Sequence, residues 1–215
     1  TQVPFVTEES RTRTESTRAL IQRTEQATSA SREEWLKSLD VQVSIQIRNT
    51  TSGPDMARVF ELINKTNQFN TNGHRWTQTE FDDFFKTGGV CVHASLKDRA
   101  VDNGIIGVVM VGDGSLTQAV LSCRVFGLGA EVVMGSVATR IALARAQKAK
   151  GSIVDTGRNF TCHGYFDTLG FQPVEGGFES EKACAFPDWT RVSITDETGL
   201  YAATESDGAT GLLAG

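Results

Sequence analysis

The stretch of sequence that decides the fold runs from residue 121 to residue 130 and reads LSCRVFGLGA. It begins as an apolar strand, passes through Gly127 and Gly129, and opens an Ala- and Val-rich helix expected over 130–149. Glycines let the backbone turn its N–H groups outward, and a helix start adds partial positive charge. We therefore expect this turn to hold a phosphate. Its spacing is Arg124-x-x-Gly127-x-Gly129, which is neither the Rossmann nor the Walker pattern.

The segments on either side of this turn read as an alternation of strands and helices. Expected strands cover residues 41–47, 90–97, 105–111, 116–125, 152–155, 171–174 and 183–194. Expected helices cover residues 56–65, 130–149 and 160–169, and a capping box at 77–80 opens one more. Gly112-Asp113-Gly114 is a hairpin signal, and Gly151 stands where the long helix should end. This order predicts a mixed α/β (α+β) domain with a central sheet flanked by helices.

The chain divides by composition into three parts. Residues 1–39 are rich in Arg, Glu, Thr and Ser, and they are interpreted as a helical lead-in that joins the domain to an upstream one. Residues 40–194 carry the apolar periodicity of a folded domain. Residues 195–215 are Gly, Ala, Ser and acidic residues, typical of a flexible tail.

Composition excludes several classes of function. The net charge of -5 over 215 residues gives no basic field for a nucleic acid, and no apolar run is long enough to span a membrane. The four cysteines show no CxxC spacing, which indicates reduced thiols in a cytoplasmic protein. The three histidines have no ligand-like spacing, so we expect no metal site.

Two sets of motifs resemble known families. Arg124-x-x-Gly127-x-Gly129 resembles the acyl-CoA-binding signature of the GNAT (GCN5-related N-acetyltransferase) fold, and Asn159 with the YFDTLGF string at 165–171 resembles its second signature. More closely, KTNQFN at 65–70, DNGIIGV at 102–108 and the glycine turn resemble the C-terminal half of FkbH-like proteins. The resemblance covers about residues 8–194.

The FkbH-like resemblance implies a function and partners. These proteins pair a HAD-type phosphatase-like domain with an acyltransferase-like domain, and they load a glyceryl unit onto an acyl carrier protein for polyketide pathways. It implies that the phosphopantetheine of the carrier protein, or coenzyme A, lies on the turn, and that a HAD-type domain acts upstream or in trans. The phosphate would contact Arg124 and the backbone of Phe126, Gly127, Leu128, Gly129 and Ala130. The hydroxylated acyl group would contact Asn67, Gln68, Asn70, Arg75 and Asn159.

The chain departs from these families at two places. The Asp-x-Asp-x-Thr/Val loop of the phosphatase half is absent. Phe166 stands where the resemblance places a general-acid tyrosine, and Tyr165 precedes it by one helical position, about 100° around the axis. General-acid catalysis from this helix is therefore not expected.

These departures direct attention to Cys123, which lies between an expected strand and a helix start, next to Arg124. Thioester exchange needs a nucleophilic thiolate. Arg124 and the start of the following helix both lower the pKa of a nearby thiol and so favour the thiolate. Cys123 is predicted to carry the acyl group as a thioester, with His163 as its base; the alternative is an inert strand cysteine. Two other functions stay open: an acyl-CoA-dependent N-acyltransferase on a small amine, and a non-catalytic docking domain for the carrier protein. The carrier is expected to dock on basic residues of the long helix: Arg140, Arg145, Lys148 and Lys150.

Overall fold

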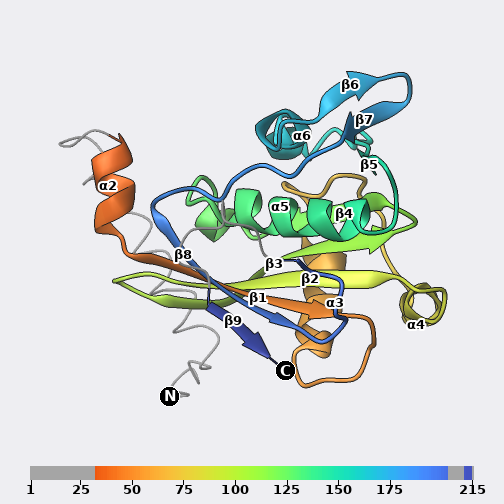
Figure 1. Ribbon diagram of the computed structural model, residues 1–215, viewed down its shortest axis with the longest axis horizontal. Coiled ribbons are helices and arrows are strands. Elements are labelled where there is room, and N and C mark those ends of the chain that lie inside the picture. Colours follow the sequence, from red (N-terminus) through yellow and green to blue (C-terminus); the bar gives the residue numbers. More distant parts are fainter. Residues whose placement is uncertain (1–31, 203–210, 215) are drawn as a thin grey trace, which may run out of the picture.

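A computed structural model describes residues 32–202 and 211–214 of the chain. In that part nine strands form one sheet, in the order β6-β7-β5-β4-β3-β2-β1-β8-β9 (Figure 1). The strands are β1 (Val41–Arg48), β2 (Val90–Lys97), β3 (Asp102–Gly112), β4 (Ser115–Leu121), β5 (Ala149–Gly151), β6 (Gln172–Val174), β7 (Gly177–Ser180), β8 (Thr190–Asp196) and β9 (Gly211–Ala214). The helices are α2 (Arg32–Ser38), α3 (Met56–Lys65), α4 (Gln78–Lys86), α5 (Ala130–Leu143) and α6 (Tyr165–Thr168).

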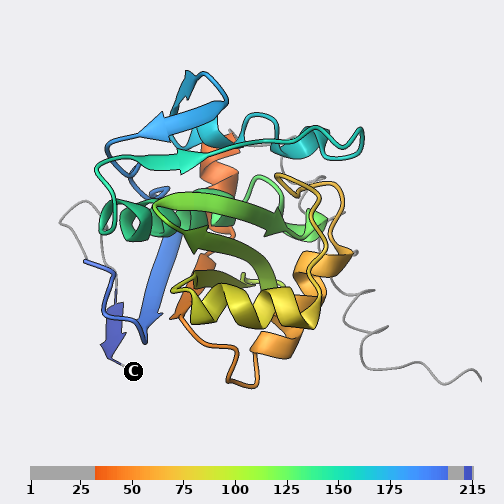
Figure 2. The same ribbon diagram turned by 90° about the vertical axis from the view of Figure 1, so that its right-hand side faces the viewer.

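The sheet is mixed. Strands β1 to β4 are antiparallel neighbours, whereas β4 pairs with β5 in parallel and β1 pairs with β8 in parallel. Helix α5 covers one face, and α3 and α4 cover the other (Figure 2). The alternation along the second half of β3 serves both layers, because Val109 and Val111 join the core under α5 while Val108 and Met110 join the core under α3. The predicted mixed α/β class is confirmed.

Several predicted boundaries next to the glycine turn and after it are wrong. Strand β4 stops at Leu121, and a 3-10 turn, Cys123–Val125, follows it. Helix α5 ends at Leu143, six residues before the predicted end, because Ala149 is fully buried and begins β5 against β7. Gly151 lies in β5, where a Cβ would stand 2.1 Å from the ring of Phe166. Close packing against an aromatic ring, not a helix end, requires this glycine.

Other predicted elements are replaced by shorter ones. Residues 152–155 are not a strand, and the predicted helix 160–169 is split into a 3-10 turn, Phe160–Cys162, and α6. The predicted strand 183–194 begins only at Thr190, and β7 was not predicted. Strand β6 is the predicted strand 171–174 shortened by one residue. Strand β7 pairs with β5, and β8 pairs with β1, through contacts distant in sequence that local periodicity does not report.

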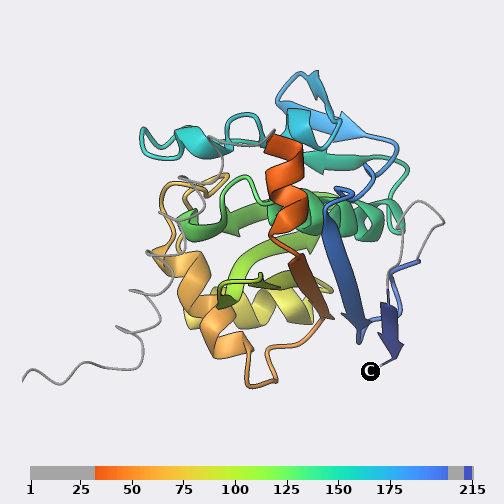
Figure 3. The same cartoon turned by 90° about the vertical axis from the view of Figure 1, so that its left-hand side faces the viewer.

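The two ends of the chain contribute to the described fold. Helix α2, the last part of the expected lead-in, buries Trp35 and Leu36 in the core under α5, and Arg32 donates to the carbonyl of Gly127 at 3.2 Å. Figure 3 shows α2 beside the start of α5. At the other end, β8 continues to Asp196 and β9 pairs with it in parallel. The remainder of the lead-in and residues 203–210 and 215 lie outside the described residues.

Candidate functional site

Residues 66–71, which belong to the KTNQFN motif and its continuation, lie along the edge of β4. Strands β4 and β5 pair only at Ser115 and Leu116 and then diverge. Beyond that point the edge of β4 is taken by the motif: the N–H of Leu121 donates to the carbonyl of Phe69 at 3.1 Å, and the N–H of Thr71 donates to the carbonyl of Ala119 at 3.0 Å. An edge that could pair with an extended ligand is therefore already paired within the chain.

Two of the predicted acyl-binding amides hold this loop in place. Asn70 and Asn159 are fully buried. The amide N–H of Asn159 donates to the carbonyls of Asn70 at 2.7 Å and Val154 at 2.9 Å, and its oxygen accepts from the N–H of Thr156. The Asn70 amide donates to Thr66 and accepts from the N–H of Gly73. Their hydrogen bonds are made inside the protein, so they shape the site without offering a group to a ligand.

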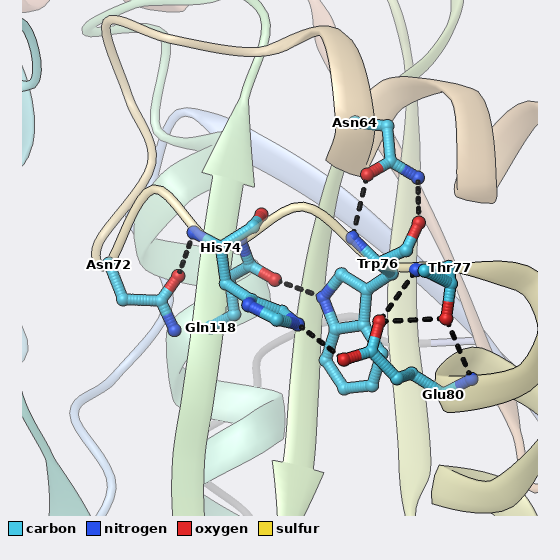
Figure 4. A network of polar contacts seen from close by, with 7 residues as sticks. All are labelled: Asn64, Asn72, His74, Trp76, Thr77, Glu80 and Gln118. Carbon is cyan, nitrogen blue, oxygen red and sulfur yellow. Dashed lines mark hydrogen bonds and ion pairs between the residues drawn. The ribbon is translucent and has the colours of Figure 1, made fainter.

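A second group of hydrogen bonds fixes the other side of the same loop (Figure 4). Gln118, buried on β4, donates to the side-chain oxygen of Asn70 at 2.9 Å and to the carbonyl of His74 at 3.0 Å. The side chain of Asn64 accepts a hydrogen bond from the N–H of Trp76 and donates one to the carbonyl of Trp76. The predicted capping box between Thr77 and Glu80 is present and starts α4. The loop is thus tied to β4, α3 and α4.

The other predicted acyl-binding residues lie on the surface of this loop. Asn67 and Gln68 are exposed, and so is Arg75. The guanidinium of Arg75 donates to the carbonyls of Ile63 and Thr66 at 2.9 Å, near the end of α3, and also to the side-chain oxygen of Asn67. Arg75 therefore positions Asn67, while Gln68 keeps its amide at the surface.

Cys123 lies in a pocket with these amides. The pocket has a volume of about 430 Å³, and Cys123 is exposed at the first position of the 3-10 turn. The lining residues are Leu62, Lys65, Thr66, Asn67, Gln68, Leu121, Ser122 and Cys123. The structure thus brings together three of the predicted site residues: the thiol, Asn67 and Gln68.

Two other predicted residues have different partners. The guanidinium of Arg124 donates to the carbonyl of Asn103 at 3.3 Å, at the start of β3. His163 is exposed, and its Nε2 lies 3.8 Å from Oδ1 of Asp155. It does not line the pocket that holds Cys123. The predicted Cys123–His163 pair is therefore not assembled in this structure.

The glycine turn adopts the backbone that its sequence predicts, but a carboxylate of the chain faces it. Gly127 and Gly129 have φ angles of 75° and 98°, which favour glycine. Leu128 and Ala130 are buried, and Phe126 is half-buried. Burial raises the pKa of the Glu131 carboxyl, whereas hydrogen bonds from the backbone of residues 131, 129 and 127 oppose the rise. The N–H groups predicted to bind phosphate thus already interact with Glu131.

A second pocket, of about 380 Å³, opens beside this turn. It is lined by Phe69, Leu121, Phe126, Gly127, Glu131, Thr161, Gly164, Tyr165 and Thr168. Phe166, in the expected general-acid position, is fully buried and packs on Phe171 and Phe178, whereas its neighbour Tyr165 lines the pocket. The sequence interpretation missed Glu131. An acidic residue in the first turn after the glycines was the available signal.

No protein-family model, curated protein or solved structure matches the chain. Among residues 32–202 and 211–214, no helix is long and apolar enough to cross a membrane. The same residues contain no group of three or more His, Cys, Asp or Glu side chains that could hold a metal ion.

Proposed function

We propose that this chain is an acyltransferase-like domain that passes a glyceryl-type acyl group to the phosphopantetheine thiol of an acyl carrier protein. The observation that carries the proposal is the exposed thiol of Cys123 in a pocket with the amides of Asn67 and Gln68. Lys65 lines the same pocket, and its exposed ammonium is paired with Glu61, so a phosphate-bearing arm would have to replace that carboxylate as its partner. A GNAT-like arrangement of β4, glycine turn and α5 is part of the proposal, as is a HAD-type domain that supplies the acyl unit.

The proposed chemistry is thioester exchange. The Cys123 thiolate attacks the carbonyl carbon of a donor thioester, the donor sulfur leaves as a thiolate, and the thiol proton passes to it through solvent. A carrier thiolate then attacks the new thioester in the same way and releases Cys123. Amide N–H groups of Asn67 or Gln68 are suited to stabilise the oxyanion that forms in each attack. The leaving group is a thiolate, whose thiol has an ordinary pKa of about 8.5, so the exchange does not require the general acid that Phe166 replaces.

Intact mass spectrometry tests the proposal directly. The full chain is incubated with glyceryl-loaded carrier protein, and Cys123→Ser is compared with wild type. We expect a glyceryl adduct on wild type and none on the variant. The matched control is Cys184→Ser, because Cys184 is the other thiol that is not buried; it should keep the adduct. An adduct that survives in Cys123→Ser, or none on wild type, would reject transfer through this thiol.

One observation favours a second candidate, the docking domain without catalysis. The predicted base His163 faces Asp155 and does not line the pocket of Cys123. A docking domain predicts that the carrier protein binds wild type and Cys123→Ser equally while neither becomes acylated. The mass experiment combined with a binding titration separates the two functions.

A further inference from the structure

Two residues that line the pocket beside the glycine turn each carry a polar atom that is buried behind the pocket wall and has no partner among the described residues. Tyr165 is 4% exposed, and its hydroxyl has no hydrogen-bond partner among the described residues. The Oε2 atom of Glu131, which lines the same pocket, is also buried and unpartnered among them. Because buried polar groups in folded proteins are nearly always hydrogen-bonded, two such atoms on residues of one pocket wall mark that wall as a candidate ligand site.

The backbone of α5 makes room for this arrangement. Gly135 lies four residues after Glu131 and therefore on the same face of the helix. A Cβ at Gly135 would stand 2.7 Å from the Tyr165 hydroxyl. The glycine allows the phenol to rest against α5 on the face that carries the carboxylate. Consistent with this proximity, burial and then the charge of Glu131 raise the pKa of the Tyr165 phenol, which stays a hydrogen-bond donor.

The walls and charges of the pocket restrict what it can bind. Phe69 packs on Phe126 with ring centroids 5.7 Å apart and on Tyr165 at 5.2 Å, so much of the wall is aromatic. The Glu131 carboxylate repels a phosphate. Arg32, which reaches Gly127 and stabilises the charge of Glu131, repels an ammonium group. A small uncharged ligand with hydroxyl groups meets all of these conditions.

We propose that this pocket binds the neutral, dihydroxylated part of the acyl group, and that the side chains of Glu131 and Tyr165 turn toward it so that one hydroxyl donates to Oε2 of Glu131 and accepts from the hydroxyl of Tyr165. The inference rests on the proposed function for the identity of the acyl group. It assigns recognition of the hydroxyls to Glu131 and Tyr165, because Asn70 and Asn159 form their bonds within the chain. Leu121 lines both this pocket and the pocket of Cys123, so the two sites are adjacent.

The test compares two thioesters that differ only in the hydroxyl groups. Glyceryl- and propionyl-N-acetylcysteamine are titrated against the full chain carrying Cys123→Ser, and binding is followed by NMR chemical shifts. This background cannot form an adduct through Cys123. We expect the glyceryl thioester to bind about tenfold more tightly, since two hydrogen bonds are each worth on the order of a few-fold. Equal affinities for the two thioesters would overturn the inference.

Substitutions then assign the preference to residues. Tyr165→Phe and Glu131→Met, each of similar size to the residue replaced, should each reduce the preference about threefold or more. The control is Tyr201→Phe, because Tyr201 is the only other tyrosine and lines neither pocket. A preference that survives both Tyr165→Phe and Glu131→Met would place hydroxyl recognition elsewhere and overturn the inference.

The results distinguish this inference from the proposed function. A preference for the glyceryl thioester without any adduct on wild-type Cys123 would retain the pocket and reject the covalent route. An adduct on Cys123 with no preference between the two thioesters would retain the covalent route and reject hydroxyl recognition in this pocket. Tyr165→Phe removes only a hydroxyl that bonds to none of the described residues, so we expect this variant to fold and to report on binding.

Discussion

Two buried polar clusters near β4 and α5 differ in how their hydrogen bonds are completed. The amides of Asn70 and Asn159 bond to backbone and side-chain groups of the chain. Glu131 Oε2 and the Tyr165 hydroxyl are buried without such partners in the described residues. The KTNQFN motif pointed to the first cluster as the acyl site. The comparison shows that the first cluster builds the loop, while the second has bonding capacity left for a ligand.

The largest expected effect on stability comes from removing one amide of the first cluster. Asn159→Leu leaves the carbonyls of Asn70 and Val154 and the N–H of Thr156 without this partner. We expect a loss of about 3 kcal/mol in the free energy of unfolding, because each buried group left unpaired costs about 1–3 kcal/mol. Urea denaturation measures the loss.

Asn67→Ala is the control for Asn159→Leu, since Asn67 is an exposed amide of the same motif. Its free energy of unfolding should stay within about 0.5 kcal/mol of wild type. Similar losses in both variants would mean that burial does not separate structural from surface amides in this loop.

For a substitution in the second cluster we expect the free energy of unfolding to change in the opposite direction. Tyr165→Phe removes a buried hydroxyl that has no partner in the described part of the chain, so the variant should be more stable than wild type by about 1 kcal/mol in the absence of ligand. Urea denaturation of Tyr165→Phe beside Tyr201→Phe measures the difference. Destabilisation by Tyr165→Phe alone would show that the Tyr165 hydroxyl has a hydrogen-bond partner in solution. The hydrogen bonds of the second cluster would then be complete, like those of the first.

The smallest expected effect is in the pH dependence of stability. Burial raises the pKa of Glu131 above its ordinary value of 4.5, so the stability it contributes is present below pH 4.5 and is lost as the pH rises through the folded-state pKa. Glu131→Gln removes that loss. Between pH 4.5 and 6.5 the free energy of unfolding of the Glu131→Gln variant should therefore rise more steeply with pH than that of wild type.

His93 provides a matched control of opposite sign. It is buried on β2 with Nε2 2.6 Å from Asp55 Oδ2, and burial lowers its pKa below 6.5 although Asp55 opposes the shift. Its contribution is present above pH 6.5 and is lost as the pH falls. His93→Gln should therefore flatten the same curve, again measured by urea denaturation at each pH. Parallel curves for wild type and both variants would contradict both assignments.

The sequence was informative where a local pattern determines the structure. The glycine turn, the start of α5 and the capping box at Thr77 follow from backbone conformation and neighbouring side chains, and all three were predicted. The pairing of Phe69 and Thr71 with β4 depends on residues about 50 positions away. Likewise, nothing local in the sequence indicates that Tyr165, not Phe166, lines a pocket, because this depends on how α6 meets α5.

Helix α2 has a consequence for anything attached upstream. Its first described residue, Arg32, touches the glycine turn at Gly127, which lines the Glu131 pocket. A module joined through the N-terminal lead-in would thus be tethered at the rim of the pocket. A tether raises the effective concentration of its cargo, to the millimolar range where it is short, without any docking surface between the two modules. Under the proposed function, the chain's own connectivity would then perform part of the delivery of the acyl group.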